Sequence, residues 1–443
     1  MSYGKKEQKH LTFCLLWQVI DILSFLSQSS MVSSSPKVQS YMGPLLIIAV
    51  LFSVFGFLTW VNSVLIAFFK QVFDLSTVAS NLVAFAFLIS YTVMAIPASM
   101  FLNRTGFKNG MSLGLLVMAT GTLVFVPAVR MVSYPLFLVG LFVTGIGMTV
   151  LQTAANPYAT ILGPRESAAQ RISFLGIANK LAGIASQYIF GGLLLTGANT
   201  VASAASLEKI IAPYLILTAL LVVLAGLIRF SSLPELSEEQ DNPSSSPAAA
   251  SQPVSAVQTR IWQFPNLILG VVTLFCYVGA EVIAGDTIIN YGRALGFNND
   301  EAKYFTTYTL YGLLAGYLLG IVLIPRFISQ QTALRFGAIY SLLLTVATLL
   351  SSGFTSVLCV ALLGFGLAPI WPAIWPLALN GLGRFTKTGS ALLIMGISGG
   401  ALLPLLHGYI TDTVSPKMAY ALLLPLFSFI LYYAIWGHKK TSW

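Results

Sequence analysis

The sequence predicts an all-α membrane protein with twelve transmembrane helices arranged as two six-helix bundles. Of its 443 residues, 56% are hydrophobic and only 8% are charged, whereas soluble chains average about 25% charged residues. A soluble fold has no means of burying so much apolar surface. The apolar residues also recur in blocks of about 20, long enough to cross a hydrocarbon core of about 30 Å. Because lipid offers the backbone no hydrogen-bond partner, each block is expected to be a helix.

Apolar runs separated by polar breaks define the twelve spans. They begin near residues 44, 78, 110, 134, 170, 210, 265, 301, 332, 354, 386 and 417. After the sixth run the chain becomes acidic and then rich in Ser, Pro and Ala, a composition typical of a flexible linker. We therefore expect an N-terminal bundle over residues 42–232, a linker over 233–263, a C-terminal bundle over 264–438 and a tail over 439–443. Paired halves of this kind hold a central site at their interface, exposed alternately to each side.

A further apolar run, residues 11–26, precedes the first span. It is too short to cross a membrane and is interrupted by Gln18 and Asp21. The sequence restarts at Met31 with a polar lead into the first span. We expect residues 1–41 to be a non-essential cytoplasmic extension, with an amphipathic surface helix as the alternative, and whether residues 1–30 are translated stays open.

The distribution of positive charge predicts the orientation, because Lys and Arg of short loops are retained in the cytoplasm. One set of alternate segments holds twelve of them, namely Arg104, Lys108, Arg165, Arg171, Arg229, Arg260, Arg326, Arg335, Arg384, Lys387, Lys439 and Lys440. The opposite set holds six, namely Lys70, Arg130, Lys209, Arg293, Lys303 and Lys417. Both termini and the linker are therefore expected in the cytoplasm, and the chain in a bacterial inner membrane.

The composition also argues against other classes of protein. Despite a net charge of +9, the Lys and Arg residues are scattered and form no basic stripe, so nucleic-acid binding is not indicated. The three cysteines have no CxxC spacing, which argues against a disulfide framework or a zinc site. With three histidines, no Walker loop, no HExxH sequence and short outer loops, neither an enzyme nor a bound cofactor or metal is expected. We expect a monomer whose partners are membrane lipid and a small molecule.

Polar residues in the middle of a span are informative, since most side chains there face lipid or pack. Asn62 lies near the middle of the first span, where its amide is suited to a sugar hydroxyl or, equally, to a hydrogen bond between helices. In the fourth span Pro157 frees a carbonyl and lets the helix bend, which exposes Gln152 and Asn156. Three polar groups of this kind predict a binding site.

The tenth span carries Trp371 and Trp375, four residues apart and therefore on one helix face. Indole rings stack well on the apolar face of a pyranose. Anchoring at the membrane surface is the alternative for any such Trp, but these two lie in mid-span among three prolines. We expect them to line a pocket.

Charged residues deep inside a span are the rarest feature. Of fourteen acidic residues only Glu281 and Asp286 lie inside a span well away from its ends, and Lys180 is the only basic residue equally deep. A buried carboxylate is costly unless it is paired or neutral. Since spans five and seven belong to opposite halves, a pair between Lys180 and Glu281 is expected to form in one access state and break in the other. Glu281 is our first candidate for binding the coupling ion, that is, a cation whose movement across the membrane accompanies that of a transported molecule. The alternative is that Lys180 and Glu281 form a static structural bridge.

Several stretches resemble the fucose, glucose and galactose branch of the major facilitator superfamily: FGFLTWVNSVL, LQTAANPYATILGP, FCYVGAEVIAGD and IWPAIWPLALNGLG. The similarity runs from about Gly43 to the C-terminus. It implies twelve helices and uptake of glucose, galactose, fucose or N-acetylglucosamine, coupled to H⁺ or to Na⁺ bound near Glu281. The segment GIANKLAG is similar to the hexose and N-acetylglucosamine members and adds Asn179 to the candidate sugar-binding residues.

The sequence departs from the fucose symporters at two positions. Those proteins carry an Asp after the residue that matches Asn62 and a Glu just before the TAANP segment, where this chain has Ser63 and Gln152. Glutamine at the second position is usual among the hexose-type members. The resemblance therefore supports sugar uptake but not the fucose-type proton relay, and a uniporter or a transporter-like sugar sensor stays open.

Overall fold

The structure is a computed structural model of the chain. It describes residues 42–161, 168–195, 204–231, 261–324, 327–382 and 385–440. The predicted extension over residues 1–41, most of the linker over 233–263 and the side chain of Asn156 lie outside the described residues. Residues from Pro44 onwards form one compact unit.

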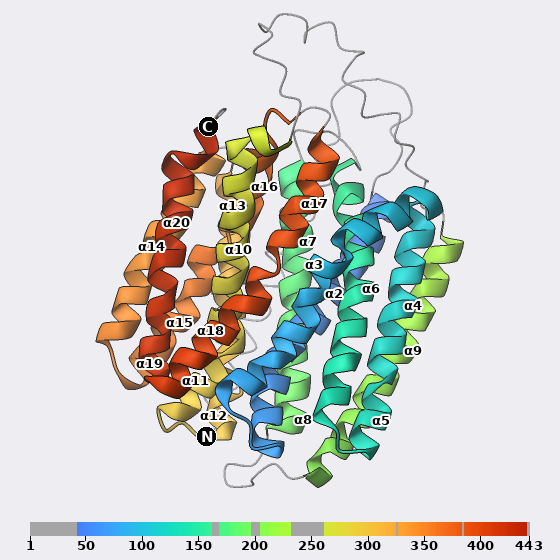
Figure 1. Ribbon diagram of the computed structural model, residues 1–443, viewed down its shortest axis with the longest axis vertical. Helices are drawn as coiled ribbons and strands as arrows, with labels where there is room; N and C mark the ends of the chain where they lie inside the picture. The colour runs from blue at the N-terminus through green and yellow to red at the C-terminus, as the bar shows by residue number, and fades with distance from the viewer. Residues whose placement is uncertain are drawn as a thin grey trace, which may run out of the picture. The chain divides into compact units, whose positions relative to one another are not determined.

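The N-terminal half consists of upright helices that lie side by side (Figure 1). They are α2 (Met42–Val72), α3 (Thr77–Thr105), α4 (Phe107–Leu123), α5 (Phe125–Arg130), α6 (Tyr134–Ile161), α7 (Ala168–Ser186), α8 (Gly192–Leu194) and α9 (Glu208–Phe230). A π-helix, η2 (Gln187–Gly191), joins α7 to α8 without a break.

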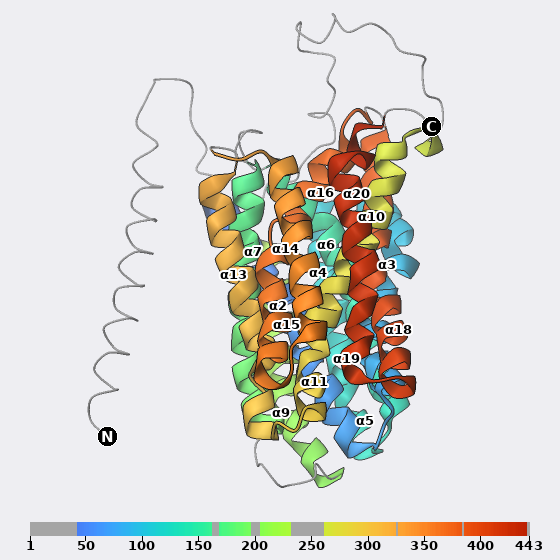
Figure 2. The same ribbon diagram turned by 90° about the vertical axis from the view of Figure 1, so that its left-hand side faces the viewer.

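The C-terminal half also consists of upright helices; it lies beside the first half in Figure 1 and in front of it in Figure 2. Its helices are α10 (Pro265–Asp286), α11 (Ile288–Ala294), α12 (Asn299–Ala302), α13 (Phe305–Leu323), α14 (Gln330–Leu350), α15 (Gly353–Leu367), α16 (Ile370–Leu379), α17 (Thr386–Gly396), α18 (Gly399–Thr413), α19 (Pro416–Ala419) and α20 (Leu423–Ile435). Within the described residues every regular element is a helix, which confirms the predicted all-α membrane fold.

Eleven stretches of the described residues are long and apolar enough to cross a membrane. Each begins within about one helical turn of a predicted start. The predicted fifth span is not among the eleven, although α7, η2 and α8 form continuous helix from Ala168 to Leu194. Its mean hydropathy is low because it carries Arg171, Asn179, Lys180 and Gln187. The polar residues that weaken the apolar signal of this segment are those that matter for the site.

Two of the C-terminal spans are broken in the middle. The tenth span changes from α15 to α16 at Ala368 and Pro369, and the eleventh changes from α17 to α18 at Ile397 and Ser398. Proline has no backbone N–H and its ring clashes with the preceding turn, so the helix ends where Pro369 enters. Irregular backbone at membrane depth is tolerated where protein surrounds it.

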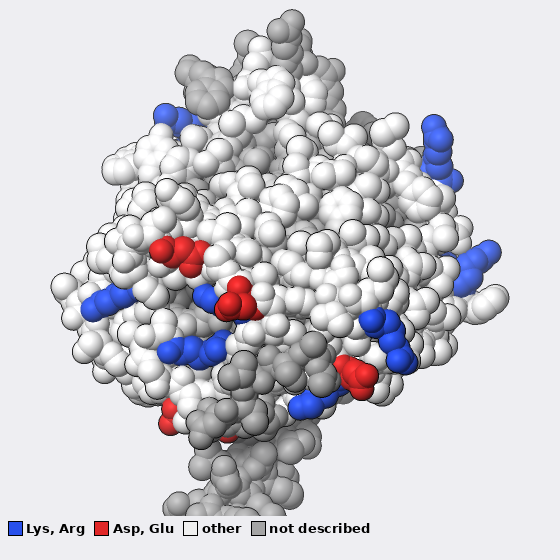
Figure 3. Space-filling view, turned by 60° about the horizontal axis from the view of Figure 1, so that its bottom comes forward, with Lys and Arg blue, Asp and Glu red and all other residues white. Residues whose placement is uncertain are grey.

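The two halves meet along α3 with α17 and α18, and along α7 with α13. Hydrogen bonds join them at the end where α11 and α19 lie, here called the α11–α19 end. Asp412 accepts from the backbone N–H groups of Thr77 and Val78, at 3.0 Å each. Asn81 Nδ2 donates to the carbonyl oxygen of Pro404 at 2.7 Å. Acidic and basic side chains are mixed over this end of the molecule (Figure 3).

Candidate functional site

An ion pair crosses the interface between the halves. Lys180 on α7 and Glu281 on α10 lie 3.0 Å apart, measured from Nζ to Oε1, and their side chains are only 9% and 14% exposed. The structure thus brings together the two charged residues that the sequence singled out. Removing one partner of a buried pair leaves an uncompensated charge and typically costs about 3–5 kcal/mol. The contact therefore links two helices of opposite halves through a bond that depends on both charges.

Trp60 on α2 also contacts the lysine. The Lys180 Nζ lies 4.6 Å from the centre of the Trp60 ring, a distance at which the ring attracts a cation. The indole is 4% exposed and fits between two glycines. A Cβ placed on Gly183 would lie 2.6 Å from Trp60 Cδ1, and one placed on Gly285 of α10 would overlap the same ring. The absence of side chains at both positions leaves the space that Trp60 fills.

Aromatic residues lead from Glu281 to the predicted tryptophan pair. The Tyr277 hydroxyl, one helical turn before Glu281, interacts with the Glu281 carboxylate and with the Tyr317 hydroxyl of α13. The Tyr277 ring lies 5.9 Å from the Trp371 ring, and the Trp371 and Trp375 rings lie 5.7 Å apart. The predicted stacking surface on α16 is therefore connected to the ion pair through Tyr277.

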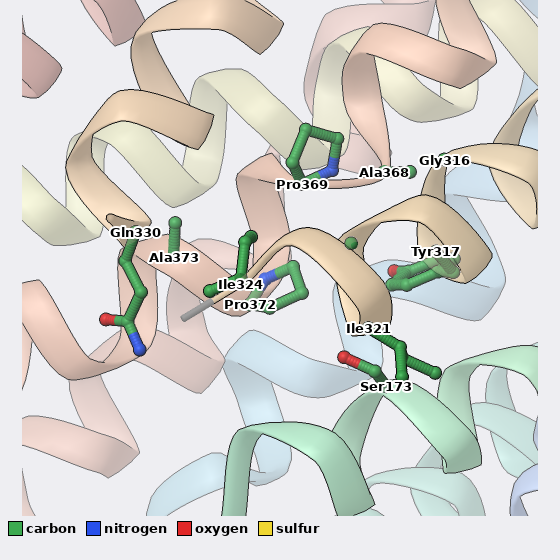
Figure 4. Close-up of a pocket in the computed structure, with 11 residues that line it drawn as sticks. Ser173, Gly316, Tyr317, Ile321, Ile324, Gln330, Ala368, Pro369, Pro372 and Ala373 are labelled. Atoms are coloured by element: carbon green, nitrogen blue, oxygen red, sulfur yellow. The ribbon is translucent and has the colours of Figure 1, made fainter. Parts of the chain in front are cut away.

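A small pocket lies on the other side of Tyr317. It is lined by Tyr317 of α13, Ser173 of α7 and Pro372 and Ala373 of α16 (Figure 4). Its volume of about 30 Å³ exceeds the roughly 10–15 Å³ that a cavity needs to hold a water molecule. It has room for water beside Tyr317.

A second cluster of polar side chains consists of Asn62 and Ser63 on α2 and Gln187 on η2. Asn62 is buried and its Oδ1 atom has no hydrogen-bond partner among the described residues. The neighbouring Ser63 hydroxyl lies 3.1 Å from Gln187 Oε1, and Gln187 Nε2 donates to the carbonyl oxygen of Trp60. Gln187 begins the π-helix η2, and such segments are frequent at functional sites. Ser63 is therefore engaged with Gln187, while Asn62 Oδ1 is a buried acceptor without a partner among the described residues.

The remaining predicted residues that the structure describes have other contacts. Gln152 on α6 interacts with the Tyr91 hydroxyl of α3. Asn179 Nδ2 donates to the carbonyl oxygen of Phe52 at 3.2 Å, a contact between helices α7 and α2. Asp286 is buried at the end of α10 and has no ion pair within the described residues. Trp375 Nε1 is buried without a partner there, so it resembles Asn62 in having an unused hydrogen-bonding atom.

Sequence reasoning missed Trp60, Tyr277, Tyr317 and Gln187. Aromatic residues are common in apolar helices and gave no signal of their own. The only available hint for Trp60 and Tyr277 was spacing: Trp60 precedes Asn62 by two residues, and Tyr277 precedes Glu281 by one helical turn.

The sequence matches the Major Facilitator Superfamily over residues 46–402. It is 33% identical to a glucose/galactose transporter of Brucella abortus biovar 1 (strain 9-941), over 89% of this chain and 93% of that protein. It is 28% identical to the L-fucose-proton symporter of Escherichia coli (strain K12), over 84% of this chain and 88% of that one. The structure is similar to that of FucP, a Major Facilitator Superfamily transporter, in the outward conformation, with a TM-score of 0.70 and 26% identity, covering 91% of this chain and 100% of that one.

Proposed function

Because this chain belongs to the Major Facilitator Superfamily, a family of transporters and not of enzymes, we propose that it imports a monosaccharide together with a cation. The glucose/galactose transporter of Brucella abortus supports a hexose, and the L-fucose-proton symporter supports a proton as the coupling ion. The charge asymmetry predicts that the C-terminus is cytoplasmic. In this proposal the sugar binds among Asn62, Gln152, Asn156, Asn179, Trp371 and Trp375.

The ion pair between Lys180 and Glu281 is the observation that carries this proposal. Burying two charges is costly, and a well-packed apolar pair is often as stable or more stable. A pair that serves only to hold the halves together has no need of charge. A pair that must break during transport does, because protonation of Glu281 cancels the attraction at once. The halves are then free to separate at this point.

Trp60 offers Lys180 a remaining contact when the ion pair breaks. When Glu281 is protonated, Lys180 loses its counter-charge but keeps the face of the Trp60 ring at 4.6 Å. Desolvated contacts of this type are worth about 2 kcal/mol or more. Tyr277 and Tyr317, which lead from Glu281 towards the small pocket beside α16, supply hydroxyl groups that can pass a proton. Asp286 is a second carboxylate on α10 and is the alternative residue for binding the coupling ion.

The substitution Glu281→Gln tests the proposal. It keeps the size of the side chain but can neither accept a proton nor pair with Lys180. We expect the variant to lose accumulation of labelled sugar against a gradient in proteoliposomes while it still exchanges sugar, since only exchange proceeds without ion movement. Asp300→Asn is the matched control, because Asp300 pairs with Lys303 within the same half at 2.7 Å and has no part in the proposed step.

A double variant separates coupling from a static bridge. If the pair is only structural, Lys180→Gln combined with Glu281→Gln removes both charges together and restores accumulation. If Glu281 carries the ion, accumulation stays lost. A Glu281→Gln variant that still concentrates sugar overturns the assignment, and a wild-type protein that transports no sugar overturns the proposed function.

A further inference from the structure

Asp286 is a buried carboxyl group that the ion pair leaves without a partner. It ends α10 and is 5% exposed. Its carboxyl group has neither a hydrogen bond nor an ion pair within the part of the chain that the structure describes. Two charged side chains act on it, Glu281 on the same helix and Lys180 on α7. These three groups therefore form one electrostatic unit inside the protein.

The unit contains two acids and one base. Lys180 already pairs with Glu281 at 3.0 Å, so an ionised Asp286 would leave an uncompensated negative charge in the interior. A buried carboxylate without a counter-charge is costly, and such a group takes up a proton and becomes neutral instead. With a proton on Asp286 the three groups together are neutral.

Trp60 contacts the lysine and also packs against the backbone next to Asp286. The Lys180 Nζ lies 4.6 Å from the centre of the Trp60 ring, and a Cβ placed on Gly285 would overlap the same ring. Glu281 and Asp286 are five residues apart, a rise of about 7.5 Å along a helix, and lysine has a flexible four-carbon stem. An ammonium group that moves from Glu281 towards Asp286 therefore passes the Trp60 ring, which attracts a cation.

The two carboxyl groups lie in order across the membrane. Beyond Thr287, α10 is followed by α11 at the α11–α19 end (Figure 1), so Asp286 is nearer to that end than Glu281. Glu281 is the one that interacts with Tyr277, whose hydroxyl also interacts with Tyr317 beside the small pocket. The predicted orientation places the α11–α19 end outside. A proton that enters at Asp286 and leaves from Glu281 therefore moves inwards.

We propose that Asp286 and Glu281 form a relay for the coupling proton, in which Asp286 receives the proton and passes it to Glu281 while Lys180 moves the opposite way. The proton leaves a carboxyl oxygen of Asp286 and binds a carboxylate oxygen of Glu281, directly or through a water molecule. Lys180 stays protonated and changes its counter-charge from Glu281 to Asp286. The three groups together stay neutral across this step, so no unpaired charge is left in the interior.

Release of the proton completes the relay. When Glu281 gives up the proton on the inner side, Lys180 returns to it and Asp286 takes up the next proton from the outer side. This inference rests on the proposed function, in which protonation of Glu281 breaks the ion pair. It adds the group from which the proton comes and the group to which the lysine moves.

The infrared band of protonated carboxylic acids tests where the proton resides. Difference spectra between wild type and variants are recorded on purified protein without sugar at neutral pH. We expect Asp286→Asn to remove the band of one carboxyl group. Glu281→Gln should remove the same band, because Lys180 then pairs with Asp286 and keeps it ionised. Lys180→Gln should double the band, because neither acid has a counter-charge. Asp300→Asn is the matched control and should leave the band unchanged, since Asp300 pairs with Lys303 within the same half.

The Glu281→Gln spectrum decides between the relay and an isolated acid. If this variant keeps the band, Asp286 holds a proton of its own and exchanges nothing with Glu281, which overturns the proposal. If the wild type has no band that Asp286→Asn removes, Asp286 is ionised in the folded protein, and the proposal is overturned as well. Glu281→Met carries the same prediction and takes the place of Glu281→Gln if that variant does not fold.

Transport separates the relay from the proposed function. Accumulation of labelled sugar is measured in proteoliposomes under an inward proton gradient. Asp286→Asn is expected to lose accumulation, as Glu281→Gln does, because no proton reaches Glu281 from the outer side. If Asp286→Asn accumulates sugar as the wild type does while Glu281→Gln does not, the relay is overturned and the proposed function stands. If the wild type concentrates none of D-glucose, D-galactose, L-fucose and N-acetylglucosamine, the proposed function fails and the relay fails with it.

Discussion

The carboxylate of Asp412 is expected to hold the α11–α19 end closed. It belongs to α18 of the C-terminal half, yet it accepts the N–H groups of Thr77 and Val78 at the start of α3 in the N-terminal half, each at 3.0 Å. These N–H groups have no partner within their own helix, and a negative charge is favourable at a helix N-terminus. The contact exists only while this end is closed, so its loss should favour the open state.

The substitution Asp412→Asn removes the charge and one of the two accepting oxygens. A lost cap of this kind costs about 0.5–2 kcal/mol, typically about 1, and the exposed position of Asp412 argues against a larger value. Since about 1.4 kcal/mol corresponds to a factor of ten, we expect the ratio of open to closed molecules to rise about fivefold.

Labelling of a buried cysteine measures this ratio. Ala84 lies on α3 beyond Asn81, is fully buried, and carries the cysteine in a chain whose own three cysteines are replaced by serine. We expect Asp412→Asn to raise the rate of modification by an impermeant maleimide, applied to the outer face, about fivefold. Asp300→Asn, at the same end but bonded within its own half, should leave the rate unchanged. A rate that Asp412→Asn leaves unchanged or lowers would refute the reasoning.

Three further predictions concern Trp60, the sugar site and the orientation. Gly285→Ala places a methyl group against the Trp60 ring. It should lower the free energy of unfolding by about 1–3 kcal/mol and so lower the thermal stability and the accumulation of sugar. Gly320→Ala is the control and should lower neither, since the space around Gly320 is open. Gln152→Ala should weaken sugar binding by about 1–3 kcal/mol, measured as the KM for exchange, and an unchanged KM would remove Gln152 from the site. Ser245→Cys, in the linker, should resist an impermeant reagent outside intact cells, and its modification would reverse the predicted orientation.

The sequence predicts the course of the chain well because the bilayer itself imposes the pattern. A helix must be apolar over its whole crossing length, so the spans follow from hydropathy alone. The same argument identifies Lys180 and Glu281 from the sequence, since charges at that depth are costly and therefore rare. Their pairing across the interface also follows, because only one basic residue lies at the right depth.

Other parts of the site depend on packing that no single-residue signal reports. Trp60 is one of seven tryptophans in a chain with 12% aromatic residues, and only the two glycines facing it reveal its position.

The capping of α3 by Asp412 also has an evolutionary consequence. One half of the molecule completes a helix of the other, so neither position is free to change alone: moving the start of α3 by one residue would turn its N–H groups away from the carboxylate. Among relatives that keep this contact, the residues around Thr77 and the residue at position 412 are therefore expected to vary together.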